Sequence, residues 1–141
     1  MIIEEFVVIH TSLEKTWDTF ADLTCWKKWN SVISDVSADT EILAAHTTLR
    51  CNFRPFFFRI RLNIAVEKVI PYSHIVWSSA KKGLSAHHDF FFRNHEKGVT
   101  VTSRESFTGL LVKGSGILLP ISKMRSLTKI FLRELKKAAE A

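Results

Sequence analysis

The chain has 141 residues, a hydrophobic content of 46% and a formal net charge of +6, which suits one globular domain with a single core. No stretch reaches the roughly 18 consecutive apolar residues that a membrane-spanning helix needs. The first residues, MIIEEF, carry acids where a secretion signal carries basic charge. We therefore expect a single domain over residues 1–141 in a cytoplasmic protein.

The N-terminal region predicts one strand followed by two short helices. Residues 2–10, IIEEFVVIH, are rich in β-branched side chains, which is typical of a strand. Thr11 and Glu14 have the spacing of a capping box, and apolar residues then recur at helical spacing to about Asp22. Thr24 is predicted to cap a second short helix through CWKKW.

Residues 31–107 predict six strands. The clearest runs from Phe58 to Val66, where apolar and polar side chains alternate, as in an antiparallel sheet with one solvated face. Turn signals divide the region at Ala38-Asp39, Pro55, Pro71-Tyr72-Ser73, Lys82-Gly83 and Glu96-Lys97-Gly98.

A long amphipathic helix closes the chain. Its apolar stripe starts at Met124, and the opposite side is basic. Pro120 disfavours an earlier start, so we predict Ser122 as the cap and an irregular approach over residues 110–119. Because this helix alone is long enough to cover the apolar face of the sheet, we expect the sheet to curve around it and leave a cavity between them.

Three runs of sequence carry a resemblance to a known family. They are TSLEKTWDTFADLTCWKKWNSVI at residues 11–33, HDFFFRNHEKGVTVTSRESFTGLL at residues 88–111, and the closing LRELKKAAE. In this order they resemble the START-like, or SRPBCC, helix-grip superfamily, and within it the polyketide cyclase/dehydrase-like group. The resemblance implies an α+β helix-grip fold, with a seven-stranded curved antiparallel sheet wrapped around the C-terminal helix. It also implies a superfamily whose members include lipid carriers, hormone receptors and aromatic cyclases.

The leading functional interpretation is binding of an apolar or amphipathic small molecule, whether lipid, polyketide-like or aromatic, in the cavity between sheet and helix. The protein is then a carrier or sensor rather than an enzyme, with no cofactor. The side chains expected to line the cavity are Leu49, Cys51, Phe53, Leu62, Ile64, Trp77, His88, Phe90, Glu105, Phe107, Leu127 and Phe131.

His88 and Glu105 are the polar candidates. Both share strand parity with apolar residues, so adjacent strands could bring an imidazole and a carboxyl group together in an apolar pocket. The pair could orient a ligand, form a structural hydrogen bond, or serve as acid and base in a cyclase or dehydratase acting on a poly-carbonyl compound. No metal site is expected, because the neighbouring His87 and His88 face opposite sides of a strand.

The run FRPFFFR predicts a further contact surface. Its consecutive aromatic side chains cannot all face the core. The run is therefore interpreted either as an irregular hairpin or as a segment that makes transient contact with an anionic membrane. The residues involved are Arg54, Phe56, Phe57, Phe58 and Arg59. A protein-interaction module is a further alternative, in a monomer or dimer. Nucleic-acid binding is not expected, since no recognised reading motif is present. Cys25 and Cys51 are predicted to be reduced and half-buried.

Overall fold

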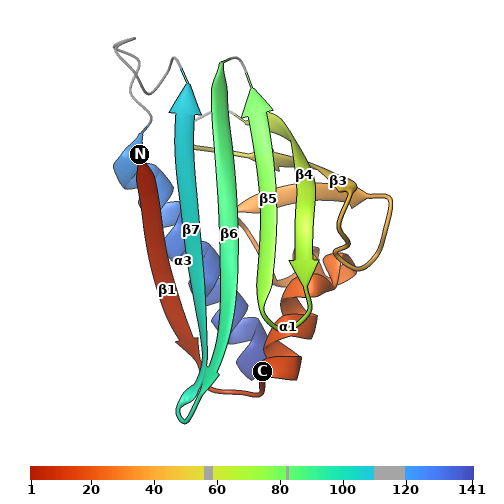
Figure 1. Cartoon of the computed structure of the whole chain (residues 1–141), viewed down its shortest axis with the longest axis vertical. Coiled ribbons are helices and arrows are strands. Elements are labelled where there is room, and N and C mark those ends of the chain that lie inside the picture. The colour runs from red at the N-terminus through yellow and green to blue at the C-terminus, as the bar shows by residue number, and fades with distance from the viewer. Residues whose placement is uncertain (56–58, 82, 110–119) are drawn as a thin grey trace.

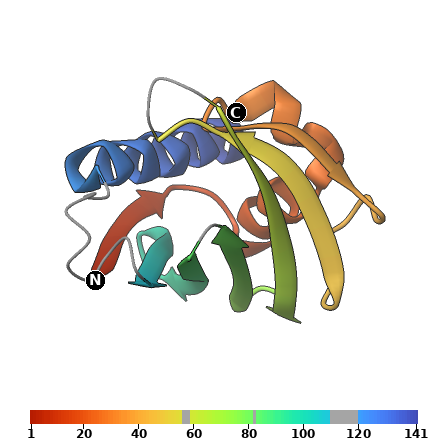
Figure 2. The ribbon, with the colours of Figure 1, turned by 90° about the horizontal axis from the view of Figure 1, so that it is seen from above.

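The computed structural model of the chain describes residues 1–55, 59–81, 83–109 and 120–141. Seven strands form one antiparallel sheet in the order β1-β7-β6-β5-β4-β3-β2, and α3 lies across one face of it (Figures 1 and 2). The strands are β1 (Ile2–Ile9), β2 (Ile33–Ala38), β3 (Thr47–Phe53), β4 (Ile60–Ile70), β5 (His74–Lys81), β6 (Leu84–His95) and β7 (Gly98–Gly109). The helical segments are α1 (Leu13–Ala21), the 3-10 turn Leu23–Cys25, α2 (Trp26–Trp29) and α3 (Ile121–Glu140).

The predicted fold class is confirmed. The sheet curves around α3, and the short helices that follow β1 stand at one end of α3 (Figure 2). The turns predicted at Pro71–Ser73 and after His95 separate strands as expected. The predicted start of a strand at Phe58 and the predicted irregular approach over residues 110–119 lie outside the described residues. In the part of the chain that the structure describes, no helix combines the length and the hydropathy needed to cross a bilayer.

The caps of the helices differ from the prediction. Ser12, not Thr11, caps α1, because its Oγ accepts the backbone N–H of Lys15. Thr24 does not cap α2, whose N-cap is Cys25 with no side-chain hydrogen bond. Asp22 caps the 3-10 turn that precedes α2, because its carboxylate accepts the Thr24 N–H.

The last helix also begins earlier than predicted. The N-cap of α3 is Pro120 rather than Ser122, and no side chain bonds to this helix end within the described residues. Proline suits the start of a helix, since the first N–H groups have no partner inside the helix.

Polar contacts fasten α3 to β1. The Arg125 guanidinium donates to Glu5 at 2.7 Å, and the Lys136 ammonium donates to the Val8 carbonyl at 2.7 Å. The apolar stripe of the helix is buried through Met124, Phe131, Leu132, Leu135 and Ala139. The basic side of α3 is therefore partly used in holding the helix to the first strand.

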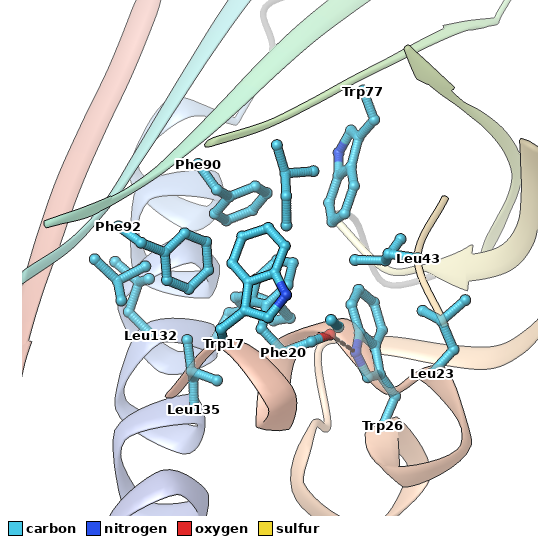
Figure 3. Close-up of a cluster of buried hydrophobic side chains, with 14 of the residues drawn as sticks. Trp17, Phe20, Leu23, Trp26, Leu43, Trp77, Phe90, Phe92, Leu132 and Leu135 are labelled. Atoms are coloured by element: carbon cyan, nitrogen blue, oxygen red, sulfur yellow. Dashed lines mark hydrogen bonds between the residues drawn. The ribbon is translucent and has the colours of Figure 1, made fainter. Parts of the chain in front are cut away.

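The main core is an aromatic cluster between the sheet, α1 and α3. The side chain of Phe20 is fully buried, and its ring lies 4.9 Å from the Phe90 ring and 5.5 Å from the Phe92 ring, measured between centroids (Figure 3). The Trp26 indole N–H donates to the Phe20 carbonyl at 2.7 Å, shown as the dashed line in Figure 3. Trp17, on the same helix as Phe20, packs edge-on against Phe92. The cluster fills one end of the space between sheet and helix.

A close backbone approach ties the β6–β7 turn to the end of β1. Gly98 has a φ of +135°, and a Cβ atom built on it would lie 2.2 Å from the Ile9 carbonyl oxygen. Only glycine fits this position without moving backbone. Ile9 is itself paired with Val99, so the approach lies at one end of the β1–β7 ladder.

Candidate functional site

A pocket lies between the concave face of the sheet and α3, beside the aromatic cluster. Its volume is about 80 Å³. Strands β3 to β7, the segment at the start of β2, and α3 all contribute to its wall. The lining residues are Val32, Ile33, Cys51, Phe53, Leu62, Ile64, Trp77, Ser79, Ala86, His88, Phe90, Ser103, Glu105, Met124, Leu127, Thr128 and Phe131.

The structure brings most of the predicted site residues to this pocket, although their binding role stays a prediction. Two do not line it. Leu49 is buried in the main core, and Phe107 belongs to a smaller cluster with Ile3 and Met124. Cys51 does line the pocket but is 1% exposed rather than half-buried, and burial raises the pKa of its thiol to about 11.

The polar side chains on the sheet side of the pocket form a short chain. His88 on β6 and Glu105 on β7 are directly paired in register, and His88 Nδ1 lies 3.5 Å from Glu105 Oε2. The other ring nitrogen, Nε2, lies 2.7 Å from the hydroxyl oxygen of Ser103. Ser103 sits two residues before Glu105 on the same face of β7, so one strand supplies both neighbours of the imidazole.

Burial sets the protonation states of Glu105 and His88. It raises the pKa of Glu105 to about 7, and it lowers the pKa of His88 to about 3, against a smaller opposing effect from the Asp89 carboxylate. A carboxyl group that keeps its proton and an imidazole that stays neutral together form an uncharged network near pH 6. The network can donate and accept hydrogen bonds without placing a net charge in an apolar pocket.

Solved structures with dissimilar sequences share this architecture. A protein of Thermus thermophilus is 14% identical with a TM-score of 0.81, over 99% of this chain and 97% of that one. A hypothetical protein of Helicobacter pylori is 17% identical with a TM-score of 0.78, over 99% of this chain and 88% of that one. The chain has the helix-grip fold.

The same helix-grip architecture occurs in a protein from a biosynthetic pathway. The di-domain ARO/CYC StfQ, from the steffimycin biosynthetic pathway, is 13% identical with a TM-score of 0.77, over 99% of this chain and 52% of StfQ. This chain therefore spans about half of that protein. No protein-family model and no curated protein matches the sequence. At such identities the likeness establishes the fold, and the ligand has to be argued from the pocket.

A second histidine cluster lies on the outer face of the helix-grip sheet. The Asp89 carboxylate contacts His74 Nε2 at 2.7 Å through one oxygen and His87 Nε2 at 3.3 Å through the other. The His74 ring is also stacked on Phe91 at 4.5 Å between centroids. His87 and His88 face opposite sides of β6, so the outer cluster is separate from the pocket.

The FRPFFFR run is described only in part. Phe53 lines the pocket, Pro55 is buried, and Arg54 and Arg59 are exposed. Phe56, Phe57 and Phe58 lie outside the described residues. The contact with an anionic membrane surface therefore stays a prediction.

Replacing Glu105 with Gln is expected to change how stability depends on pH. In the wild type the folded protein holds the Glu105 proton between pH 4.5 and about 7, where the unfolded chain releases it, so stability is lost as the pH rises through this window. The shift corresponds to roughly 3 kcal/mol, which we reduce to about 2 kcal/mol because the pocket admits solvent. The free energy of unfolding of Glu105→Gln, relative to wild type, should therefore rise by about 2 kcal/mol between pH 4.5 and pH 8.

Urea denaturation at a series of pH values measures this difference. His88 contributes the opposite slope between pH 3 and 6.5, but it does so in both proteins and cancels in the comparison. Glu96→Gln, on the exposed β6–β7 turn, is the control for the loss of a carboxylate. A difference between Glu105→Gln and wild type that stays constant across the pH range would contradict the expectation.

Proposed function

We propose that the protein binds an apolar or amphipathic small molecule in the pocket between the sheet and α3, as a carrier or sensor. The observation that carries the proposal is the composition of the pocket wall. Most of its side chains are apolar, from Leu62 on β4 to Phe131 on α3, and the buried chain of Ser103, His88 and Glu105 interrupts them on the sheet side. Apolar walls with a few convergent polar groups are typical of small-molecule sites.

The size of the pocket limits how a ligand enters it. A cavity of about 150 Å³ holds benzene, whereas this pocket measures about 80 Å³. A ligand with an aromatic ring therefore places only one end in the pocket or displaces side chains of the wall. Leu127 and Phe53 are only half-buried, so they have more room to move than the sealed core around Phe20.

Native mass spectrometry of the purified protein, beside the denatured mass, is the direct test. A retained small molecule supports the proposal and gives the mass of the ligand. The same protein is then stripped of ligand and heated with 1-naphthol, 1-tetralone, octanol and decanoic acid in turn. A probe present at about 100 times its Kd raises the free energy of unfolding by about 2.7 kcal/mol. The proposal is wrong if the protein is empty and no probe raises its Tm.

A matched pair of variants ties binding to the pocket. Ala86 lines the pocket on β6, so Ala86→Phe should fill it and abolish the Tm increase with every probe. Ala65, exposed on the outer face of β4, undergoes the same change in the control, and Ala65→Phe should respond like wild type. If Ala86→Phe retains full binding, the ligand lies elsewhere. Circular dichroism checks that both variants fold, and Cys51→Met is a smaller filling change for the same test.

A second candidate function is catalysis of the cyclase or dehydratase type. The observation that favours it is the direct pairing of an imidazole with a carboxyl group whose pKa lies near 7, since such a group can both give and take a proton at neutral pH. The likeness to an ARO/CYC structure supports the same candidate. Single replacement of His88 and Glu105 by Ala distinguishes it: loss of turnover with retained binding indicates an enzyme, and retained turnover excludes these residues as catalysts.

A further inference from the structure

The hydrogen-bonding capacity left in the pocket lies mainly on Glu105. Both ring nitrogens of His88 already have a neighbour, Ser103 at 2.7 Å and Glu105 at 3.5 Å. Among the described residues, neither carboxyl oxygen of Glu105 takes part in a hydrogen bond, and Oε2 only approaches His88 Nδ1 at 3.5 Å, while the side chain lines the pocket and is 20% exposed. A ligand that enters the pocket therefore meets Glu105 as the polar group with a free position.

The described wall of the pocket also holds no lysine or arginine. Arg125 on α3 directly follows the lining residue Met124, but its guanidinium is already bound to Glu5 at 2.7 Å. Glu5 pairs with Ser103 across β1 and β7, so this ion pair flanks the pocket without lining it. An anionic ligand in the pocket would lie beside Glu105 with no counter-charge, and such burial is costly.

We propose that the ligand of this pocket is a neutral molecule whose carbonyl oxygen accepts a hydrogen bond from the Glu105 carboxyl group, while Ser103 and His88 hold that group in place. The inference rests on the proposed function and narrows it to a class of ligand. It assigns Ser103 a positioning role. The inference predicts that anions, such as fatty-acid carboxylates, do not bind in this pocket.

Proton binding by Glu105 then controls the affinity. Burial raises the pKa of this carboxyl group to about 7, so the donor form dominates at pH 5.5 and is largely lost at pH 8.5. Among the described residues, few other titratable or charged groups surround it. His88 on β6, whose pKa is about 3, and Cys51 on β3, whose pKa is about 11, line the same pocket. Glu5 on β1 pairs with Ser103 and binds Arg125 of α3, while His87 and Asp89 lie on the far side of β6. None of them offers a second donor of the same kind inside the described pocket wall.

Three probes with the same ring test the inference by NMR titration of the purified protein. Cyclopentanone has the acceptor oxygen, methylenecyclopentane has the same shape without it, and cyclopentanecarboxylate carries a charge. Cyclopentanone should bind at pH 5.5 and lose about 10-fold or more in affinity at pH 8.5, because only the protonated carboxyl donates. Methylenecyclopentane should bind more weakly at pH 5.5 and equally at both pH values, and the carboxylate should not bind.

Two variants separate the hydrogen-bond donor of residue 105 from its titration with pH. Glu105→Gln keeps an N–H donor of similar size, so cyclopentanone should still bind and its affinity should become independent of pH. Glu105→Met removes the donor, so the preference for cyclopentanone over methylenecyclopentane should disappear. If either variant fails to fold, the pH series on the wild-type protein decides alone.

The possible failures are distinguishable. If methylenecyclopentane binds as tightly as cyclopentanone at both pH values, or if the carboxylate binds best, the inference is overturned while the ligand-binding function stands. If none of the three probes binds and the larger probes raise no Tm, the proposed function fails and the inference fails with it.

Discussion

Phe20→Ala is expected to lower the free energy of unfolding by about 3–5 kcal/mol. The ring of Phe20 is fully buried at the centre of the aromatic cluster and contacts rings from β5, β6, α2 and α3. Its loss leaves a cavity that the surrounding strands and helices cannot fill without moving. Because whole domains are stable by only about 5–15 kcal/mol, this one change should remove a large part of the stability. Urea denaturation followed by circular dichroism measures it.

Phe6→Ala is the matched control, since Phe6 on β1 is 67% exposed and loses the same atoms. It should change the free energy of unfolding by less than about 0.5 kcal/mol. The hydrogen bond from the Trp26 indole goes to the backbone carbonyl of Phe20 and survives in the Ala variant, so the measured loss reports the ring. Equal effects of the two changes would show that the cluster is not the stabilising core.

Gly98→Ala is expected to cost at least about 3 kcal/mol. The added methyl group would lie 2.2 Å from the Ile9 carbonyl oxygen, and the neighbouring atoms at 3.1 and 3.3 Å are also backbone. Backbone at the end of β1 must therefore shift, and the φ of +135° is strained for alanine in addition. The ladder between β1 and β7 should be disturbed first, which hydrogen exchange of its amide protons would detect as lost protection.

Lys97→Ala is the control in the same turn. Its side chain is exposed and its backbone contacts, from the N–H to His95 Nδ1 and from the carbonyl to His10 Nδ1, do not depend on the side chain. It should leave both the stability and the exchange pattern close to wild type. Full protection of β1 in Gly98→Ala would mean that the close approach is not a constraint on the fold.

The sequence predicted the elements of the fold well because their signals are local. Alternation in β4 and β7 and the apolar stripe of α3 depend only on neighbours along the chain. Helix caps were predicted less well. Thr11, Ser12, Asp22 and Thr24 can all accept a hydrogen bond, and the backbone geometry, which the sequence does not specify, selects Ser12 and Asp22.

For the candidate site, the sequence predicted which face of the sheet a side chain lies on, but not which side chains lie next to one another on that face. Strand parity correctly put His88 and Glu105 on the inner face, but their direct pairing depends on the register of β6 and β7, which is fixed by the exact ends of the short turn between His95 and Gly98 and not by parity. Parity also put Leu49 and Phe107 on that face, yet Leu49 packs in the main core and Phe107 in the smaller cluster, so parity alone does not decide which inner side chains reach the pocket. Ser103 shares the parity of Val101 and Glu105, and a small polar residue at an inner position was the available signal for it.

The placement of β1 beside β7 has a consequence for biosynthesis. About 90 residues separate Ile9 from its partner Val99, and a ribosome that adds about 5–20 residues per second needs roughly 5–20 s to make them. Throughout that interval the segment IIEEFVVI has no partner strand, and α3, whose Lys136 binds the backbone of Val8, is made later still. This edge of the sheet therefore closes only after β7 has left the ribosome, and until then a β-prone segment must be kept from pairing with other nascent chains.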